Sequence, residues 1–359
     1  SLLLLISNTP EEKLADYKLG NASIVKSISD LKIEKTDLNV LTLDYCDVKL
    51  DGKLEKDVYF FQAAENIFKL NGFDGNPWNS AVQFKTSIVD KNNFSDSSGF
   101  EVSYLFTVEK EVNKSSLQVV IEHPELWQLS INKKTIEAEP SSYWLDRKFA
   151  VYTIGDNVIN GENCITLTAP SMTVYSEVEP VYIIGDFNLE SQKKGFKLVP
   201  TKPLKLGSWK EQGNPFYSET VSYTKSFNIQ NVDKRYIVKL IEWNGSVAKV
   251  KVNNKLTSTI FSPPYELDIT DQIKVGENEI SVEVVGTLKN LLGPHHIGPV
   301  KGTAWPASFA SADKNMPPGN EYDFIDYGLF QDFMLIESEG SPQKVYWRTS
   351  KVATPIIKS

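Results

Sequence analysis

The stretch VVIEHPELWQLSINKKTI, Val119 to Ile136, decides the fold because its pattern returns later in the chain. It follows VSYLFTV, which begins at Val102, and is followed by GENCITL, which begins at Gly161. Apolar and polar residues alternate in these pieces, as they do in strands with one buried face. A hairpin with its turn at Asn132-Lys133 fits between two of the strands.

A second copy of this order occupies the other half of the chain. VSYTKSFNI begins at Val221, VKLIEWNGSVAKVKVNNKL at Val238 and GENEISV at Gly276. We match Asn132-Lys133 with Asn254-Lys255, and we interpret both Gly-Glu-Asn triplets as hairpin turns rather than catalytic groups. Repetition of this kind indicates two copies of one structural unit.

The expected fold is all-β, with two tandem antiparallel jelly-roll β-sandwiches at residues 39–200 and 201–338. Residues 1–38 open with the strand-like SLLLLIS, and residues 339–359 would be a polar tail. The first sandwich would contain one short helix within Lys56 to Leu70, where apolar residues recur at helical spacing and end near Gly72.

Composition limits the possible partners of the 359-residue chain. A net charge of −8 and only three arginines argue against nucleic acid, an anionic membrane or a dedicated phosphate pocket as partners. The two cysteines, Cys46 and Cys164, are too far apart in sequence to indicate a disulfide scaffold or a zinc cluster. We predict that both are buried free thiols.

The motifs resemble a known family. IEHPELWQLSIN followed by FAVYTIGDNVINGENCITL resembles the galactose-binding-like jelly roll that serves as the sugar-binding domain of family 2 glycoside hydrolases. NVLTLDYCDV, GTLKNLLGPHH and YGLFQDFML resemble the carboxy-terminal part of large bacterial rhamnosidase-like glycosidases. The resemblance implies a catalytic barrel upstream in the same polypeptide. It also implies that residues 1–38 are the last strands of a truncated preceding β domain. It further implies a non-catalytic role for this chain, because the chain itself shows no repeated strand-helix units.

The candidate ligand-binding residues lie in two loops rich in aromatic and amide groups. They are Trp78, Asn79, Asn290, His295, His296 and Trp305. Tryptophan can stack on the apolar face of a sugar ring, while amides and imidazoles can bond its hydroxyls. Burial of both tryptophans at a domain interface is the alternative.

The pair His295-His296 allows three interpretations: a metal site, a sugar contact, or a loop packed on the sandwich. Adjacent residues in an extended segment point to opposite sides, so the pair does not suit one metal ion, and we favour the packed loop. We predict no catalytic residue, no metal ligand and no cofactor, although a structural calcium ion is compatible with the sequence. Asp186, Asp268, Asp271, Asp323 and Asp326 are expected at the surface or in turns.

We therefore expect a carbohydrate-binding or scaffolding segment of a glycoside hydrolase. A purely structural interdomain scaffold and a standalone glycosidase are the alternatives. The sequence does not distinguish between cellular compartments.

Overall fold

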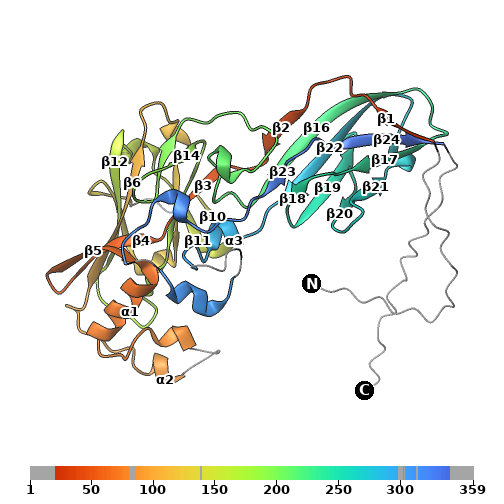
Figure 1. Cartoon of the computed structure of the whole chain (residues 1–359). Coiled ribbons are helices and arrows are strands. Elements are labelled where there is room, and N and C mark those ends of the chain that lie inside the picture. The colour runs from red at the N-terminus through yellow and green to blue at the C-terminus, as the bar shows by residue number, and fades with distance from the viewer. Residues whose placement is uncertain are drawn as a thin grey trace, which may run out of the picture.

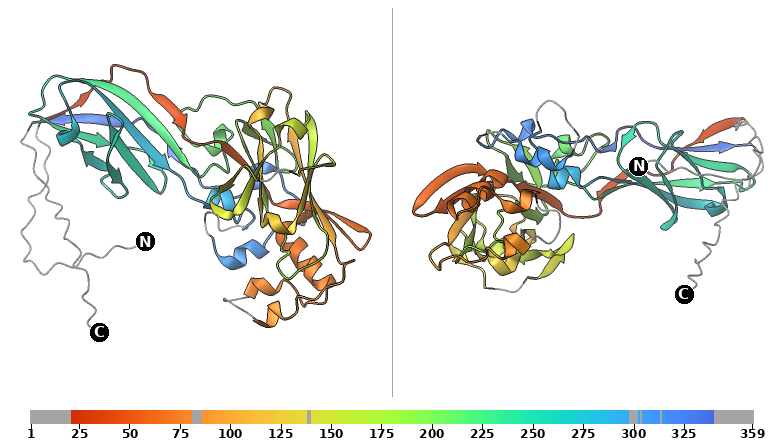
Figure 2. Two further views of the ribbon diagram at one scale, coloured as in Figure 1. Left: turned by 180° about the vertical axis from the view of Figure 1, so that it is seen from behind. Right: turned by 90° about the horizontal axis from the view of Figure 1, so that it is seen from below.

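The computed structural model describes residues 21–80, 86–137, 140–297, 302, 304–312 and 314–339. Over these residues the regular structure is mostly antiparallel strand, and the chain forms two lobes, one after the other along a long axis (Figures 1 and 2). The all-β prediction is confirmed at this coarse level. The jelly-roll identity of each lobe stays a prediction, and SLLLLIS and residues 340–359 lie outside the described residues.

Two sheets build the first lobe. One sheet has the strand order β10 (Ser142–Trp144), β11 (Asp146–Thr153), β7 (Gln118–Glu122), β13 (Val181–Gly185) and β3 (Asn39–Leu43). The other has the order β14 (Asn188–Ser191), β15 (Phe196–Val199), β6 (Phe100–Val108), β12 (Gly161–Ala169), β8 (Gln128–Ile131) and β9 (Lys134–Thr135). In this second sheet β4 (Tyr45–Leu50) also pairs with β6 and with β5 (Lys53–Tyr59).

Two further sheets and a short ribbon build the second lobe. One sheet has the order β1 (Ala22–Val25), β24 (Met334–Ser338), β17 (Arg235–Lys239) and β21 (Glu266–Asp268). The other has the order β2 (Lys32–Lys35), β16 (Thr220–Ile229), β22 (Gly276–Val285), β19 (Val247–Val252) and β20 (Lys255–Ile260). The ribbon pairs β18 (Trp243–Asn244) with β23 (Gly328–Leu329).

The two lobes repeat one pairing order. The sequence β4-β6-β12-β8-β9 in the first lobe corresponds to β2-β16-β22-β19-β20 in the second, and β11-β7-β13-β3 corresponds to β21-β17-β24-β1. β1 and β2 therefore occupy the places in the second lobe that β3 and β4 occupy in the first. We expected residues 1–38 in a separate preceding domain, but the part of this segment that the structure describes pairs with the second lobe.

The matched hairpins differ from the expected alignment by one residue. The left-handed turn residues are Asn132 and Lys133 in the first lobe but Asn253 and Asn254 in the second. Asn132 Oδ1 accepts a hydrogen bond from the backbone N–H of Cys164 at 3.0 Å, and Asn253 Oδ1 accepts one from that of Glu279 at 3.1 Å. The equivalent of Asn132 is thus Asn253, because each of these two side chains accepts a hydrogen bond from the long strand that begins with Gly-Glu-Asn.

The Gly-Glu-Asn triplets open the long strands β12 and β22. Gly161 and Gly276 have φ values of 91° and 93°, which favour glycine. The buried Asn163 donates to the carbonyls of Ile159 and Gly161, and its Oδ1 accepts from the N–H of Ile159. Asn278 makes the same set of bonds to Lys274 and Gly276. Both triplets are structural, but they are not the expected hairpin turns, because β12 pairs with β6 and β8 rather than with the preceding β11, and β22 pairs with β16 and β19 rather than with β21.

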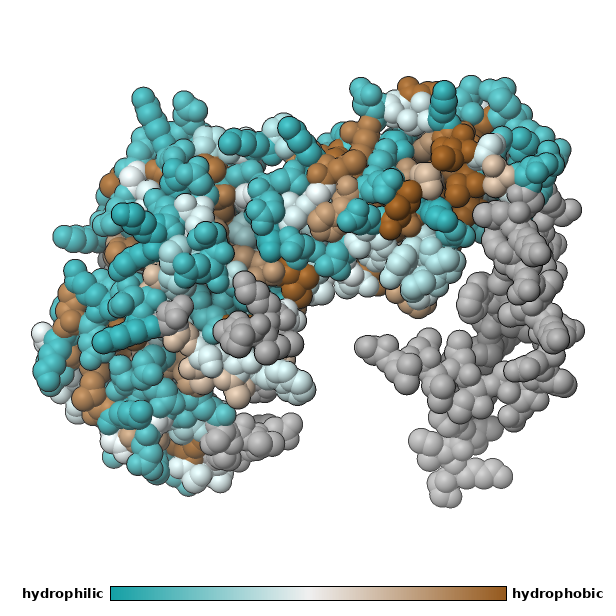
Figure 3. Space-filling view, viewed as in Figure 1, coloured by the Kyte–Doolittle hydropathy of each residue, from teal (hydrophilic) through white to brown (hydrophobic). Residues whose placement is uncertain are grey.

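Each lobe has its own hydrophobic core. The first core is continuous across both sheets of its lobe and helix α1, and the second joins the sheets of the other lobe. Burial alternates along β6 and β16, so that one face of each strand enters the core. Polar residues dominate the viewed surface, with apolar patches on both lobes (Figure 3).

Helix α1 (Phe60–Leu70) is shorter than expected. It ends before Gly72 as predicted, but Lys56 to Tyr59 belong to β5, because the Asp51-Gly52 turn pairs β5 with β4. The helix buries a stripe that includes Ile67 and Phe68. The other described α-helices are α2 (Thr86–Val89) and α3 (Lys289–Leu292).

Both cysteines are free thiols. Cys46 is buried as expected, whereas Cys164 is only partly buried, because it lies on the opposite face of β12 from its core residues. Burial raises the pKa of the Cys46 thiol well above its usual range, which makes this thiol unreactive.

The long segment after β22 crosses to the first lobe. Leu291 and Tyr322 belong to the core of the first lobe, and Phe309 and Phe324 pack against it. The chain then returns to the second lobe, where Tyr327 and Leu329 join its core. This segment between β22 and β23, the long loop, therefore belongs to the second lobe in sequence but covers part of the first.

Candidate functional site

The two adjacent histidines lie in a buried polar cluster. His296 Nε2 lies 2.8 Å from Asp44 Oδ2, and His295 Nδ1 lies 3.5 Å from the same oxygen. Tyr322 donates its hydroxyl to Asp44 Oδ1 at 3.0 Å. Both rings reach one carboxylate because the segment is not an extended strand, so our expectation that they point to opposite sides is wrong.

The histidines determine the charge state of Asp44. Burial alone would raise the pKa of this carboxyl, but hydrogen bonds and charge from His295 and His296 outweigh burial and hold its pKa well below the usual range. The carboxylate joins the turn between β3 and β4 to the long loop. Its position explains how two histidines and a tyrosine can be buried together.

Neighbouring polar groups strengthen the same attachment. Lys289 Nζ lies 3.1 Å from Asp323 Oδ2, with both side chains buried. Asn290 donates to the carbonyl of Ile325 and accepts from its N–H, each at 2.9 Å. Asp323 was expected at the surface or in a turn, and its burial corrects that expectation. Lys289 provides the compensating charge.

The candidate residues of the first loop lie beside α1. The indole of Trp78 donates to the carbonyl of Val174, and its ring stacks on Tyr175 at 6.0 Å between centroids. Asn79 is exposed and donates to Glu65 Oε1 at 2.6 Å. Trp78 is partly buried, and its indole N–H is already used in the hydrogen bond to Val174.

Trp305 lies at the surface of a groove. Its exposed fraction is 69%, and the groove is lined by Phe61, Asn79, Trp305 and Phe309 together with three alanines. The turn Pro306–Ala310 lies next to α1, as the blue segment below α3 shows in Figure 1. The fold thus brings Asn79 and Trp305 together, while Asn290, His295 and His296 lie in the buried cluster.

A second pocket adjoins this groove. Its volume is about 310 Å³, and it shares Phe61, Asn79 and Phe309 with the groove. Three carboxylates line it, namely Glu122, Glu177 and Glu179. Burial raises the pKa of each of them. No local sequence pattern marks these three residues as a group.

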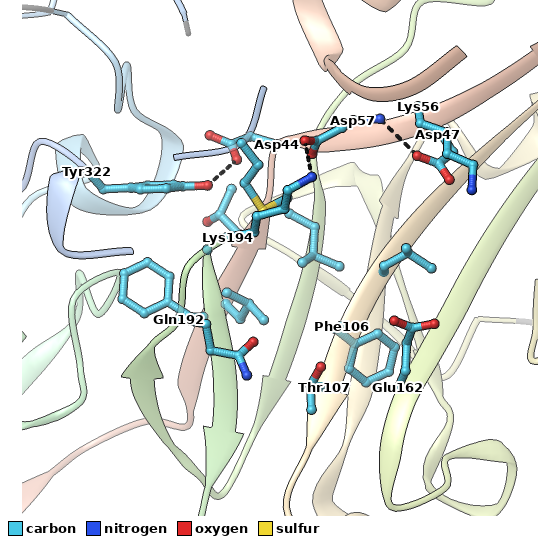
Figure 4. A pocket seen from close by; sticks show the side chains of 17 residues that line it. Asp44, Asp47, Lys56, Asp57, Phe106, Thr107, Glu162, Gln192, Lys194 and Tyr322 are labelled. Atoms are coloured by element: carbon cyan, nitrogen blue, oxygen red, sulfur yellow. Dashed lines mark hydrogen bonds and ion pairs between the residues drawn. The ribbon is translucent and has the colours of Figure 1, made fainter. Parts of the chain in front are cut away.

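A different cleft opens where one sheet of the first lobe divides. β6 pairs with β4 up to Ser103 and with β15 from Thr107, and the cleft of about 270 Å³ lies between those two neighbours. Figure 4 shows Lys194 reaching Asp57, with Oδ2 and Nζ 2.6 Å apart. The backbone N–H of Asp57 donates to Asp47 Oδ1 at 2.9 Å. These charges are paired within the protein, so the cleft is a weaker candidate than the groove.

In the ranges that the structure describes, no group of three or more His, Cys, Asp or Glu residues is placed to hold a metal ion. The described helices also include none that is long and apolar enough to cross a membrane.

The protein is rich in β-strands, and its sequence is similar in part to a large glycoside hydrolase. The chain is 30% identical over 126 residues to a protein of Formosa agariphila named putative beta-glucuronidase, covering 33% of this chain and 11% of that protein. The chain thus spans about a tenth of the length of this curated relative. The resemblance predicted from the sequence is confirmed as a partial similarity. No protein-family model matches the chain.

Solved glycoside hydrolases are similar at a lower level. A rhamnosidase from Novosphingobium sp. PP1Y is 17% identical with a TM-score of 0.29, and the match covers 69% of this chain and 24% of that one. A beta-glucuronidase from Bifidobacterium dentium is 21% identical with a TM-score of 0.25, over 42% of this chain and 28% of that one. TM-scores of this size establish no common overall fold.

Proposed function

We propose that this chain is a non-catalytic segment of a larger glycoside hydrolase and that it contacts carbohydrate through the groove beside α1. Partial similarity to the putative beta-glucuronidase supports the class. The observation that carries the binding proposal is the exposure of Trp305 in a groove that also presents the amide of Asn79. An exposed indole provides a platform for the apolar face of a sugar, and the amide can bond its hydroxyls.

A scaffold function is the second candidate, and the long loop favours it. Thr42 Oγ1 donates to the carbonyl of Leu291 at 2.8 Å, and Asp44 binds the histidines of the same loop. These contacts attach the two lobes to each other, which would hold flanking domains at a fixed separation. Scaffolding and sugar contact can occur in the same segment.

The test compares two exposed aromatic residues. Trp305→Ala should weaken the retention of the chain in glycan affinity gels about ten-fold, which corresponds to ~1.4 kcal/mol. Phe261→Ala, at an equally exposed aromatic residue of the second lobe, should leave retention unchanged. Absence of retention on a broad glycan panel would contradict the binding proposal. Hydrolysis of aryl glycosides by this chain alone would contradict the non-catalytic assignment.

A further inference from the structure

The acidic pocket beside the groove has aromatic walls. Glu122 lies at the end of β7, and Glu177 and Glu179 precede β13, so all three carboxylates come from neighbouring strands of one sheet. The rings that line the same pocket are those of Phe60, Phe61, Phe149 and Tyr182. The pocket is therefore both apolar and negatively charged.

The carboxylates have no cationic partner among the described residues. Glu177 accepts a hydrogen bond from Asn76 Nδ2 at 2.7 Å, whereas no hydrogen bond or ion pair within the described ranges reaches the carboxylates of Glu122 and Glu179. The Glu179 side chain is partly buried and lines the pocket. The imidazole of His123, which follows Glu122 in the chain, has its Nδ1 3.0 Å from Glu125 Oε1.

Burial and mutual repulsion disfavour the charged form of this cluster. Burial and the charges of Glu122 and Glu177 raise the pKa of Glu179 well above its usual range. Burial also raises the pKa of Glu122 and the pKa of Glu177. The neighbouring His123 opposes both shifts, whereas the charge of Asp146 raises the pKa of Glu122 further. A cation in the pocket would relieve this repulsion.

The shape of the cluster favours an organic cation over a metal ion. The three carboxylates do not form a metal-binding group, in contrast to the convergent oxygen ligands that calcium requires. Aromatic rings attract ammonium groups through their faces. The pocket also continues into the groove with Trp305, where the rest of a ligand would lie.

We propose that the pocket binds the ammonium group of an amino sugar whose neighbouring ring stacks on Trp305. This inference rests on the proposed carbohydrate contact and names the class of sugar. The ligand is a glycan with unacetylated glucosamine-type units, in preference to neutral or uronic sugars. Binding releases protons from the pocket, because the ammonium group stabilises the ionised carboxylates.

Calorimetry with two matched oligosaccharides tests the inference. A glucosamine tetramer should bind at least ten-fold more tightly than its N-acetylated counterpart, and its affinity should rise between pH 5 and 7. Titration in buffers of different ionisation enthalpy should show proton release. Equal affinity for the two tetramers would overturn the amino-sugar assignment and leave the proposed function intact, whereas binding of neither would overturn both.

Two variants separate recognition of the ammonium group from stacking. Glu179→Gln should abolish the preference for the glucosamine tetramer but keep the binding of its N-acetylated counterpart, whereas Trp305→Ala should weaken both. Glu101→Gln, at an exposed residue of β6, is the control and should change neither. Binding of a lysine- or arginine-containing peptide with no binding of the amino sugar would show that the pocket accepts a protein side chain, and would overturn the proposal.

A folding measurement checks that Glu179→Gln acts through the pocket. A carboxyl with a raised pKa binds its proton more tightly in the folded state, so stability falls as pH rises from the unfolded pKa toward the folded one. Glu179→Gln should remove that loss and raise the melting temperature at pH 7. A lower melting temperature would mean that Glu179 supports the fold, and would overturn its role in binding the cation.

Discussion

Asp44 is the residue on which the attachment of the long loop depends. It is 1% exposed and accepts hydrogen bonds from His296 and Tyr322. We expect Asp44→Ala to lower the free energy of unfolding by about 3–5 kcal/mol, because it leaves buried polar groups without their partner. Urea denaturation measures this loss, and faster exchange of the Asp323 amide, which bonds the His295 carbonyl, would place it in the loop.

The acid dependence of this variant provides a second check. The lowered pKa of Asp44 means that its contribution is fully present above the unfolded pKa of about 4 and is lost as pH falls toward the folded pKa. The difference between wild type and Asp44→Ala should therefore shrink below pH 4. The exposed pair Lys49–Glu101 is the control, and Glu101→Gln should cost at most about 1 kcal/mol.

Sequence reasoning identified residue types better than residue environments. It selected His295 and His296 and favoured a packed loop, which agrees with their burial against Asp44. It missed Asp44, because an aspartate at the end of an apolar strand looks like an ordinary turn residue. It also missed Glu179, since no local pattern shows that three carboxylates from different segments will face one pocket.

At the scale of elements, the two Gly-Glu-Asn turns should contribute equally to stability. Asn163 and Asn278 each bond several backbone groups while fully buried. We expect Asn163→Ala and Asn278→Ala each to cost about 2–4 kcal/mol, since several hydrogen bonds are lost and buried groups remain unpaired. Asn160→Ala removes only an exposed bond to Lys114 and should be nearly neutral.

Chemical denaturation followed by tryptophan fluorescence measures these changes. Loss of stability in one variant but not in the other would contradict the equivalence of the two turns. The alternation of apolar residues in β6 and β16 and the repeated turns were readable from the sequence because strand periodicity and turn chemistry are local. The start of α1 was not readable, because pairing of β5 with β4 overrides the helical pattern before Phe60.

At the scale of the whole molecule, the sequence of the first lobe is inserted between two parts of the sequence of the second. β1 and β2 precede the first lobe in the chain, yet they pair with β24 and β16. Sequence reasoning divides a chain at linear positions, and a lobe assembled from distant segments has no composition signal that marks its missing strands. The repeat pattern was correct, but its first two strands in the second copy were assigned to another domain.

This arrangement predicts the effect of removing residues 1–38. The second lobe would lose β1 and β2, which would expose edges of β24 and β16 and uncover apolar side chains of its core. We expect the shortened chain to aggregate in size-exclusion chromatography, and hydrogen exchange should accelerate in β16 and β22 but not in β6 and β12. If those residues belonged to a separate domain, the shortened chain would elute without aggregates and keep the protection of β16 unchanged. That result would contradict the pairing, because β1 and β2 cannot leave the two sheets of this lobe without exposing the edges of β24 and β16.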